Sequence, residues 1–317
     1  MSDHKEAKSF SRFGYIMVAA GAAIGLGNIW KFPYLAYGDG GGAFVLIYIV
    51  ICILLGHPIV QAEQAVGRRG RASAAASYGV IHPKWRFVGV INIVCTFLID
   101  IYYLVVSGWV LKYFVTYVVS GDFGKDKQAY FDNYISSTTQ PLIYSLIIIA
   151  IIVFFLFFGI TNIVEKASKV IMPMLAVLLL VCGIYALIVV PGAVDGLKYY
   201  FVPDFSKFGM QQFADACMQV CFSVGIGWGI FTTLGASMDK DANLKADAWW
   251  VDICDTFIAL LAGFVIIPTV VGTGSEMSSG PSLVFVAMTQ IFETLPGGRI
   301  IGIFFFASLI FAVISTF

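Results

Sequence analysis

Two apolar stretches of the chain carry glycine-rich interruptions whose backbone oxygens could bind an ion. They span Gly21–Asn28 and Phe222–Gly229. Glycine is a poor helix former and lets the backbone unwind at low steric cost. Unwound backbone at membrane depth leaves peptide groups unpaired, and it is tolerated only where it lines a polar cavity or binds a ligand. Each interruption therefore indicates either a site for an ion or small molecule or a seam of close helix packing through small residues.

The composition requires these stretches to lie in a bilayer. Hydrophobic residues make up 59% of the 317 residues, charged residues make up 12%, and the mean hydropathy is +0.89. A soluble domain carries about 25% charged residues to face water. The formal net charge is +0, which gives no indication of a nucleic-acid partner. We predict an all-α polytopic membrane protein.

Eight apolar segments are each long enough to cross the hydrocarbon core as a helix. They run over residues 11–37, 43–66, 87–119, 141–158, 167–190, 211–237, 246–272 and 300–317. The interruptions fall in the first and sixth segments, and this pairing points to a transport site between inverted repeats. We expect one transporter domain over residues 1–317, with a first five-helix repeat over 11–190 and a partial second repeat over 211–317. Because the chain stops inside an apolar segment, we expect a truncation within helix 8 and no activity of this chain alone.

Basic residues predict the orientation of the spans. Those that gather on one side are Lys5, Lys8, Arg12, Arg68, Arg69, Arg71, Lys84, Arg86, Lys166 and Lys169. Cytoplasmic loops carry an excess of lysine and arginine. We therefore expect a multi-pass protein of the plasma membrane with its N-terminus in the cytoplasm.

At the first interruption the sequence resembles the neurotransmitter:sodium symporter family, to which bacterial leucine-transporter-like amino-acid symporters belong. The stretch Ala20–Tyr34 looks like the signature of that family. Further matches follow in order at Gly40–Phe44, Gly56, Pro58, Glu63, Tyr102–Tyr103, Gly108–Trp109, Glu165–Lys166, Met172–Pro173, Pro203–Lys207, Ala262–Phe264 and Gly280–Pro281. The resemblance covers nearly the whole chain. It implies a leucine-transporter-like five-helix inverted-repeat fold and sodium-coupled transport of an amino acid or amine.

The resemblance also implies two sodium sites built from oxygen ligands. The first would use the Ala23 carbonyl, Asn28, Ser223 and the substrate carboxylate, with Asp255 at a position where the family usually has asparagine. The second would use the carbonyls of Gly21, Ile24 and Ala312 with the hydroxyls of Ser315 and Thr316. For the two hydroxyls, the alternative is a hydrogen bond to the backbone of their own helix. For Asp255, the alternative is a bond to a neighbouring helix with no ion.

Two departures from the family bear on chloride. Chloride-dependent members have serine where this chain has Ala259, although the rest of their chloride cage is present as Tyr48, Gln219 and Ser223. A buried carboxylate at Asp255 would supply the negative charge that chloride gives elsewhere. We therefore expect chloride-independent transport.

Ala22 stands where amine carriers of the family place an aspartate. Without that acid, an α-amino acid that brings its own carboxylate suits the site better, and the helix N-termini at the break favour that carboxylate. By resemblance, Tyr103 bonds the carboxylate and forms a lid with Phe222, although packing is the alternative role for Phe222 and Trp228. Gly225 stands where many relatives carry serine, so we expect an apolar or aromatic substrate side chain. The predicted pocket wall comprises Ala22, Ala23, Leu26, Gly27, Ile99, Tyr103, Phe222, Ser223, Gly225, Trp228 and Thr316.

Five other polar residues have predicted roles. Lys31 takes the usual place of an arginine in the extracellular gate, and Arg12 fits the cytoplasmic gate. Asp100 either reads a polar or cationic substrate side chain or pairs with another helix, and the pairing is favoured. Glu63 is expected to bond a helix backbone. His57 is expected at the membrane interface.

Three classes of function were compared. The expected function is sodium-coupled symport of an α-amino acid, and the alternative is an amino-acid-gated channel or a substrate sensor on the same scaffold, whose site would look alike. No catalytic constellation is evident, so we expect no enzyme. The expected partners are an amino acid, two sodium ions and the lipid bilayer, with no chloride, and the sequence does not indicate an oligomeric state.

Overall fold

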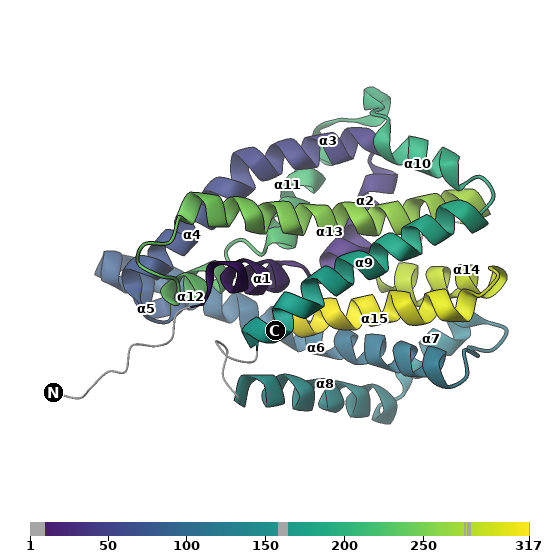
Figure 1. Cartoon of the computed structure of the whole chain (residues 1–317), viewed down its shortest axis with the longest axis horizontal. Helices are drawn as coiled ribbons and strands as arrows, with labels where there is room; N and C mark the ends of the chain where they lie inside the picture. The colour runs from purple at the N-terminus through teal and green to yellow at the C-terminus, as the bar shows by residue number, and fades with distance from the viewer. Residues whose placement is uncertain (1–9, 158–163, 276, 278–279, 317) are drawn as a thin grey trace.

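The apolar segments fold as long helices that run side by side along one axis, which is close to horizontal in Figure 1. A computed structural model of the chain describes residues 10–157, 164–275, 277 and 280–316. Apart from one isolated bridge between Gly41 and Pro203, these residues contain no β structure. A helix satisfies its backbone hydrogen bonds internally, which is the condition for crossing a bilayer.

The first half of the chain forms the helices that hold the first break. In order they are α1 (Arg12–Ala23), a π-helical turn η1 (Gly27–Lys31), α2 (Phe32–Gly38), α3 (Gly42–Ile51), a π-helical turn η2 (Cys52–Gly56), α4 (His57–Gly70), α5 (Ala74–Ile81), η3 (Pro83–Trp85), α6 (Arg86–Val119), α7 (Lys127–Ser136), α8 (Thr139–Phe157) and α9 (Glu165–Val189).

The second half holds the second break. It forms α10 (Ala193–Phe201), η5 (Phe205–Lys207), α11 (Met210–Val224), α12 (Ile230–Ala236), α13 (Leu244–Thr273), a π-helical turn η6 (Leu283–Ala287), α14 (Met288–Thr294) and α15 (Gly298–Thr316).

By length and composition, five helices of the described residues can cross a membrane, or up to seven if each of two bent pairs counts as one span. The five are Gly42–Gly70, Pro83–Val119, Glu165–Val189, Leu244–Thr273 and Gly298–Thr316, and one bent pair joins α1 to η1 and α2 at 61°. The predicted sixth segment is divided into α11 and α12, each too short to cross alone. Lys5, Lys8, Phe158 and Phe317 lie outside the described residues, and the orientation of the chain stays a prediction.

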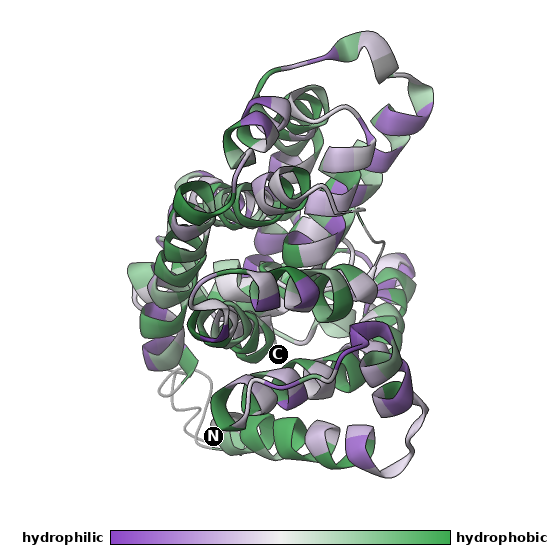
Figure 2. Cartoon of the chain, turned by 90° about the vertical axis from the view of Figure 1, so that its right-hand side faces the viewer, coloured by the Kyte–Doolittle hydropathy of each residue, from purple (hydrophilic) through white to green (hydrophobic). Residues whose placement is uncertain are grey.

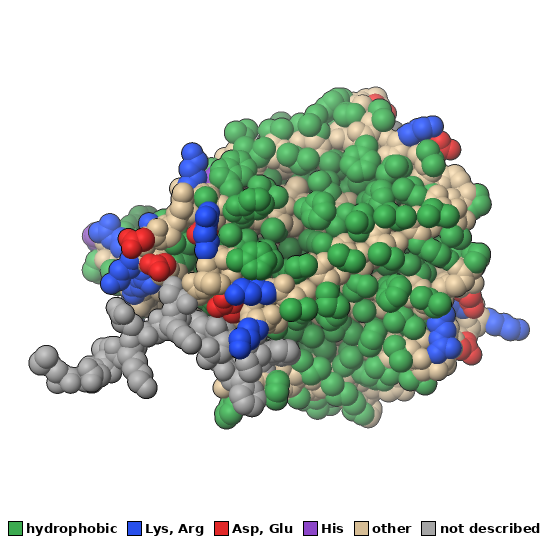
Figure 3. Space-filling model, viewed as in Figure 1, with side chains coloured by type: hydrophobic (Ala, Val, Ile, Leu, Met, Phe, Trp, Pro, Cys, Tyr) green, Lys and Arg blue, Asp and Glu red, His purple; other side chains and the backbone are tan. Residues whose placement is uncertain are grey.

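The surface has the pattern of a membrane protein. Charged side chains gather at the two ends of the face in Figure 3, and hydrophobic side chains fill the band between them. In the end-on view of Figure 2, hydrophobic residues colour most of the length of the outer helices. Helix α6 has many exposed hydrophobic side chains, such as Phe97 and Leu98.

The two breaks have different backbone causes. In the first span, α1 ends at Ala23 and Ile24 is extended, with φ −72° and ψ 103°. In the second, Gly225, Gly227 and Gly229 have φ of 76°, 82° and 75°, a left-handed region that glycine enters without the steric penalty other residues meet. The helix turns at each of these glycines before α12 begins.

The first break lies where two hydrophobic cores meet. One core packs aromatic rings of α6, η6 and α15, with the Tyr113 and Phe285 centroids 4.9 Å apart in a T-shaped pair. The other packs α2, α3 and α13 around Phe32 and Tyr48, whose rings also meet at 4.9 Å. Such aromatic pairs contribute about 0.5–1.5 kcal/mol each beyond their burial. The broken span is packed between these two cores.

Candidate functional site

A cavity of about 570 Å³ lies beside the two breaks, with walls from α1, α6, α8, α9, α12 and the end of α15. Predicted pocket residues that line it are Ala22, Ala23, Gly27, Ile99, Tyr103, Phe222, Trp228 and Thr316. Leu26, Ser223 and Gly225 do not line it. The Leu26 side chain is instead buried in the core, and Ser223 lies behind the cavity in a polar network.

Side chains replace the helical partners that the first break removes. The Gly25 N–H donates to Asn28 Oδ1 at 3.1 Å, and the Leu26 N–H donates to the Tyr103 hydroxyl at 3.2 Å. The carbonyl of Ile24 accepts from a hydroxyl of α15 at 2.9 Å. Polar atoms of three segments therefore converge on a few unwound residues.

The predicted ligands of the second sodium meet where α1 touches the end of α15. The Thr316 hydroxyl lies 2.9 Å from the Ile24 carbonyl oxygen and 2.8 Å from that of Ala312, so two acceptors share its proton. The Ser315 hydroxyl donates to Ala312 at 2.9 Å. Gly21 approaches so closely that an added Cβ would lie 2.9 Å from Ser315 Cβ. Both hydroxyls bond their own helix, as the alternative expects, but Thr316 also reaches α1.

Asp255 is buried on α13 at the centre of a second network. Asn28 Nδ2 donates to Asp255 Oδ1 and to Ser223 Oγ, each at 2.8 Å. The Ser223 hydroxyl donates to Asp255 Oδ2 at 2.9 Å, and the Tyr48 hydroxyl lies 3.5 Å from the same oxygen. Gln219, the remaining cage residue, directs its amide at a backbone carbonyl of η1 at 3.4 Å instead. Two of the three cage residues thus direct hydroxyl groups at the carboxylate.

Phe222 covers one side of the cavity. Gly27 has no side chain to hold the ring away, since an added Cβ would lie 2.4 Å from Phe222 Cε1. Lys31 Nζ lies 4.5 Å from the centroid of the ring. Trp228 meets the ring edge-on with centroids 5.5 Å apart. Phe222 and Trp228 therefore pack together and line the cavity at once.

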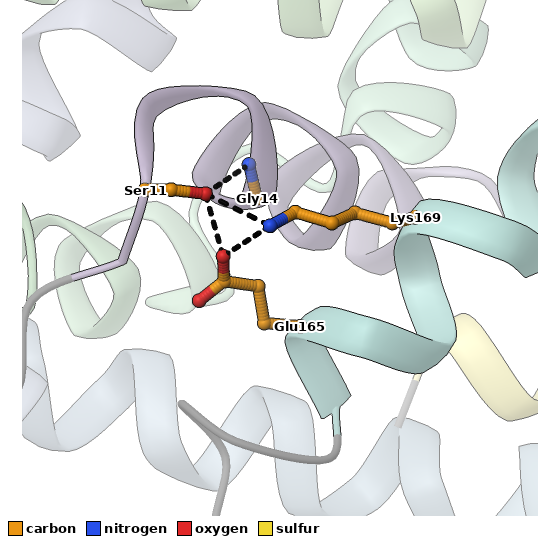
Figure 4. A network of polar contacts seen from close by, with 4 residues as sticks. All are labelled: Ser11, Gly14, Glu165 and Lys169. Atoms are coloured by element: carbon orange, nitrogen blue, oxygen red, sulfur yellow. Dashed lines mark hydrogen bonds and ion pairs between the residues drawn. The ribbon is translucent and has the colours of Figure 1, made fainter.

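The N-terminal end of α1 is tied to two other helices. Arg12 Nε donates to Asp247 Oδ1 at 2.8 Å, and the Asp247 side chain is only 2% exposed. Beside it, the Ser11 hydroxyl caps α1, donates to Glu165 Oε1 at 2.6 Å and accepts from Lys169 Nζ at 2.9 Å (Figure 4). These contacts hold α1 against α9 and α13 at this end of the chain.

The second break is held by α4 and α6. Glu63 Oε1 accepts from the Gly227 N–H at 2.8 Å, so Glu63 bonds backbone, as expected, but in the turn between α11 and α12 and not in a helix. Thr96 donates to the Trp228 carbonyl at 2.5 Å. Both contacts give hydrogen-bond partners to backbone groups that have no helical partner because of the left-handed glycines.

Sequence reasoning missed the Asp247 partner of Arg12 and a buried pair on the other side of α13. His57 Nδ1 lies 2.8 Å from Asp252 Oδ2, and the ring stacks on Trp249 with centroids 4.1 Å apart. His57 is buried among these partners, and its position at the membrane interface stays a prediction. The signal that could have found the pair was an acid within a membrane helix, which requires a partner.

Asp100 lines the cavity. No hydrogen bond or ion pair joins it to another residue in the part of the chain that the structure describes. The favoured interpretation, pairing with another helix, is therefore not what these helices show.

Three comparisons with known proteins agree. The profile of the Sodium:neurotransmitter symporter family matches residues 7–121 and 131–317. An uncharacterized sodium-dependent transporter of Haemophilus influenzae is 33% identical over 321 residues, which cover 96% of this chain and 70% of that protein. The uncharacterized sodium-dependent transporter YhdH of Bacillus subtilis is 33% identical over 321 residues, covering 100% of this chain and 71% of its own length.

A solved structure has the same fold. The crystal structure of MhsT in complex with L-phenylalanine superposes with a TM-score of 0.89 at 35% identity, covering 98% of this chain and 72% of MhsT. The predicted family and the all-helical leucine-transporter-like fold are confirmed. The chain therefore belongs to the sodium:neurotransmitter symporter family of multi-span membrane transporters and is not an enzyme.

Proposed function

We propose that the protein is a sodium-coupled symporter of an α-amino acid. The observation that carries the proposal is the convergence of backbone and side-chain oxygens on the unwound residues of the first break. Sodium is a hard cation that is bound by oxygen atoms, as calcium and magnesium are. A broken membrane helix supplies such oxygens beside a cavity large enough for an amino acid.

The first sodium would lie among Asn28, Ser223, Asp255 and the Ala23 carbonyl. In the present arrangement the Asn28 amide takes the place of a cation, because its Nδ2 donates to Asp255 Oδ1 and to Ser223 Oγ. A cation there would replace that amide N–H and bond Asn28 Oδ1 after rotation of the amide. The Asp255 charge would then have a full positive partner in place of hydrogen bonds.

The second sodium would lie between α1 and α15, among the carbonyls of Gly21, Ile24 and Ala312 and the hydroxyls of Ser315 and Thr316. Thr316 already lies within 3 Å of two of those carbonyls. A cation would bind the hydroxyl oxygen and free its proton from the Ile24 carbonyl. Because the site joins the break to a helix of the other repeat, its occupation would couple sodium to the position of α1.

The substrate carboxylate would bind at the break between Tyr103 and the first sodium. The Tyr103 hydroxyl accepts from the Leu26 N–H and donates to Thr316 Oγ1, each at 3.2 Å, so it lies at the unwound backbone. Ala22 offers no acid for an amine substrate, and Ile99, Phe222 and Trp228 give an apolar wall. MhsT, the structural relative, was crystallised with L-phenylalanine, which supports an apolar or aromatic α-amino acid.

Transport is proposed to be chloride-independent because Asp255 already takes the hydroxyl donors of Tyr48 and Ser223. The N-terminus is proposed to face the cytoplasm, so that Arg12 belongs to the inner gate and Lys31 to the outer gate.

Uptake by the full-length protein in proteoliposomes tests the proposal. An inward sodium gradient should drive accumulation of labelled L-phenylalanine or L-leucine above the outside concentration, and a potassium gradient should not. Replacing chloride with gluconate should leave the rate unchanged. Sodium-dependent current without accumulation would identify a channel instead, and binding without either would identify a sensor.

A further inference from the structure

The wall of the cavity carries a single charged side chain. Asp100 is the only aspartate, glutamate, lysine, arginine or histidine among the described residues that line the cavity. Most of the others are apolar, and they include Ile99, Phe222 and Trp228. A carboxylate in such surroundings is costly unless a positive group or several donors accompany it.

The neighbours of Asp100 on α6 do not supply that compensation. Thr96, one turn before it, is bonded to the Asn92 carbonyl at 3.0 Å and to the Trp228 carbonyl at 2.5 Å. Tyr103, one turn after it, faces the first break and Thr316. No described residue bonds the carboxylate, so a ligand that enters the cavity can bind it in place of water.

The spacing along α6 places Asp100 about one helical turn from Tyr103, which is proposed to bind the substrate carboxylate. Residues three apart on a helix lie on one face, about 4.5 Å apart along the axis. If Tyr103 holds one end of a substrate, Asp100 lies one turn further along the same wall. Ile99 and the aromatic pair of Phe222 and Trp228 lie on the apolar surface beside it.

We propose that Asp100 extends the substrate range beyond apolar and aromatic α-amino acids to those whose side chain is a long apolar stem with a positively charged end, such as lysine, ornithine and arginine. The stem packs on the apolar wall as an apolar or aromatic side chain would, and the terminal ammonium or guanidinium binds the Asp100 carboxylate. The inference rests on the proposed amino-acid symport and names the substrate class within it. A charge-assisted hydrogen bond of this kind is stronger than a neutral one.

Matched ligands isolate the charged end from the stem. Norleucine has the shape of lysine with a methyl group in place of the ammonium, and diaminopropionate has the charge on a short stem. We expect the full-length protein in detergent with sodium to bind lysine and ornithine at least about tenfold more tightly than diaminopropionate. Displacement of bound labelled lysine measures all of these affinities in one assay.

The variant Asp100→Asn should weaken lysine binding by about tenfold or more and change norleucine binding by less than about threefold. Asp195→Asn is the matched control, because it also removes one negative charge but from an exposed i,i+3 pair with Lys198 remote from the cavity residues. It should leave both affinities unchanged. Sodium-dependent norleucine binding by Asp100→Asn shows that the variant is folded.

Three results would overturn the inference. The first is wild-type binding of norleucine but not of lysine, and the second is equal lysine affinity in wild type and Asp100→Asn. The third is an Asp100→Asn variant that loses affinity only for amino acids with a neutral hydrogen-bond donor in the side chain, such as tryptophan. Each leaves the proposed symport standing. Absence of sodium-dependent binding for every amino acid in the panel would instead reject the proposed function itself.

Discussion

The two breaks in the membrane helices look alike in sequence and are built differently. The first contains Gly21, Gly25 and Gly27, yet none of these has a positive φ among the described residues. The second contains Gly225, Gly227 and Gly229, and all have one. In the first break, glycine lets neighbouring side chains lie close to the backbone. In the second break, glycine allows the left-handed backbone conformation.

The partners of the released backbone groups differ in the same way. In the first break, Asn28, Tyr103 and Thr316 bond the unwound residues from a cavity wall. In the second, Glu63 and Thr96 bond them from α4 and α6. The first break is therefore a place where ligands can exchange with side chains, and the second is a fixed turn that shapes the cavity. Substitutions in the first should change ligand binding, and those in the second should change stability.

The largest effect is expected for Asp255→Ala at the first break. Removing the carboxylate leaves the buried donors of Asn28 and Ser223 without an acceptor, which costs about 1–3 kcal/mol for each donor. The sodium concentration for half-maximal substrate binding should rise by about 100-fold or more. Sodium titration of binding measures it. Asp252→Asn, on the same helix but paired with His57, should lower the melting temperature and leave the sodium titration unchanged.

The contrast between the breaks also explains what the sequence could predict. Glycines at Gly225, Gly227 and Gly229 encode their turn locally, so a pattern of residues locates it. The first break is located by the family signature, but the atoms that hold it come from Tyr103 and Thr316, 77 and 292 residues away from their partners. Local composition carries no information about such contacts.

The same limit applies to charged pairs. The sequence predicted a gate role for Arg12 but not its partner Asp247, which lies 235 residues along the chain. Hydropathy predicted the long helices well because hydrocarbon requires a continuous apolar span. It did not predict the short helices α5, α7, α10 and α14, each of which has at most 10 residues and is too short to cross a membrane.

Glu63→Ala should have the next largest effect, and it should fall on the second break. The Gly227 N–H would lose its carboxylate acceptor, which costs about 2 kcal/mol when the group stays buried. We expect a lower melting temperature of the purified protein with sodium affinity within about twofold of wild type. A selective loss of sodium affinity with unchanged melting temperature would place the turn at residues 225–229 in the ion site.

A matched pair of alanine substitutions tests the two uses of glycine directly. An added Cβ at Gly227 meets no atom within 4 Å, so Gly227→Ala carries only the cost of a left-handed backbone, about 1–2 kcal/mol. It should lower the melting temperature and spare substrate affinity. Gly27→Ala pushes against the Phe222 ring instead and should weaken substrate binding with little change in melting temperature. The reverse assignment of the two effects would contradict the distinction between the breaks.

The smallest effect is expected at the lid over the first break, where Lys31 lies above the Phe222 ring. A cation over an aromatic face contributes about 0.5–1 kcal/mol at a partly exposed site. Lys31→Met keeps the length of the side chain and removes the charge, so the ring should open more readily and bound substrate should dissociate about two- to fivefold faster. Lys31→Arg retains the cation and should release substrate at close to the wild-type rate, because guanidinium also stacks on aromatic faces. Stopped-flow release of labelled substrate measures the dissociation rate of each variant. Equal rates for Lys31→Met and Lys31→Arg would mean that the Phe222 ring is held only by its packing over Gly27 and against Trp228.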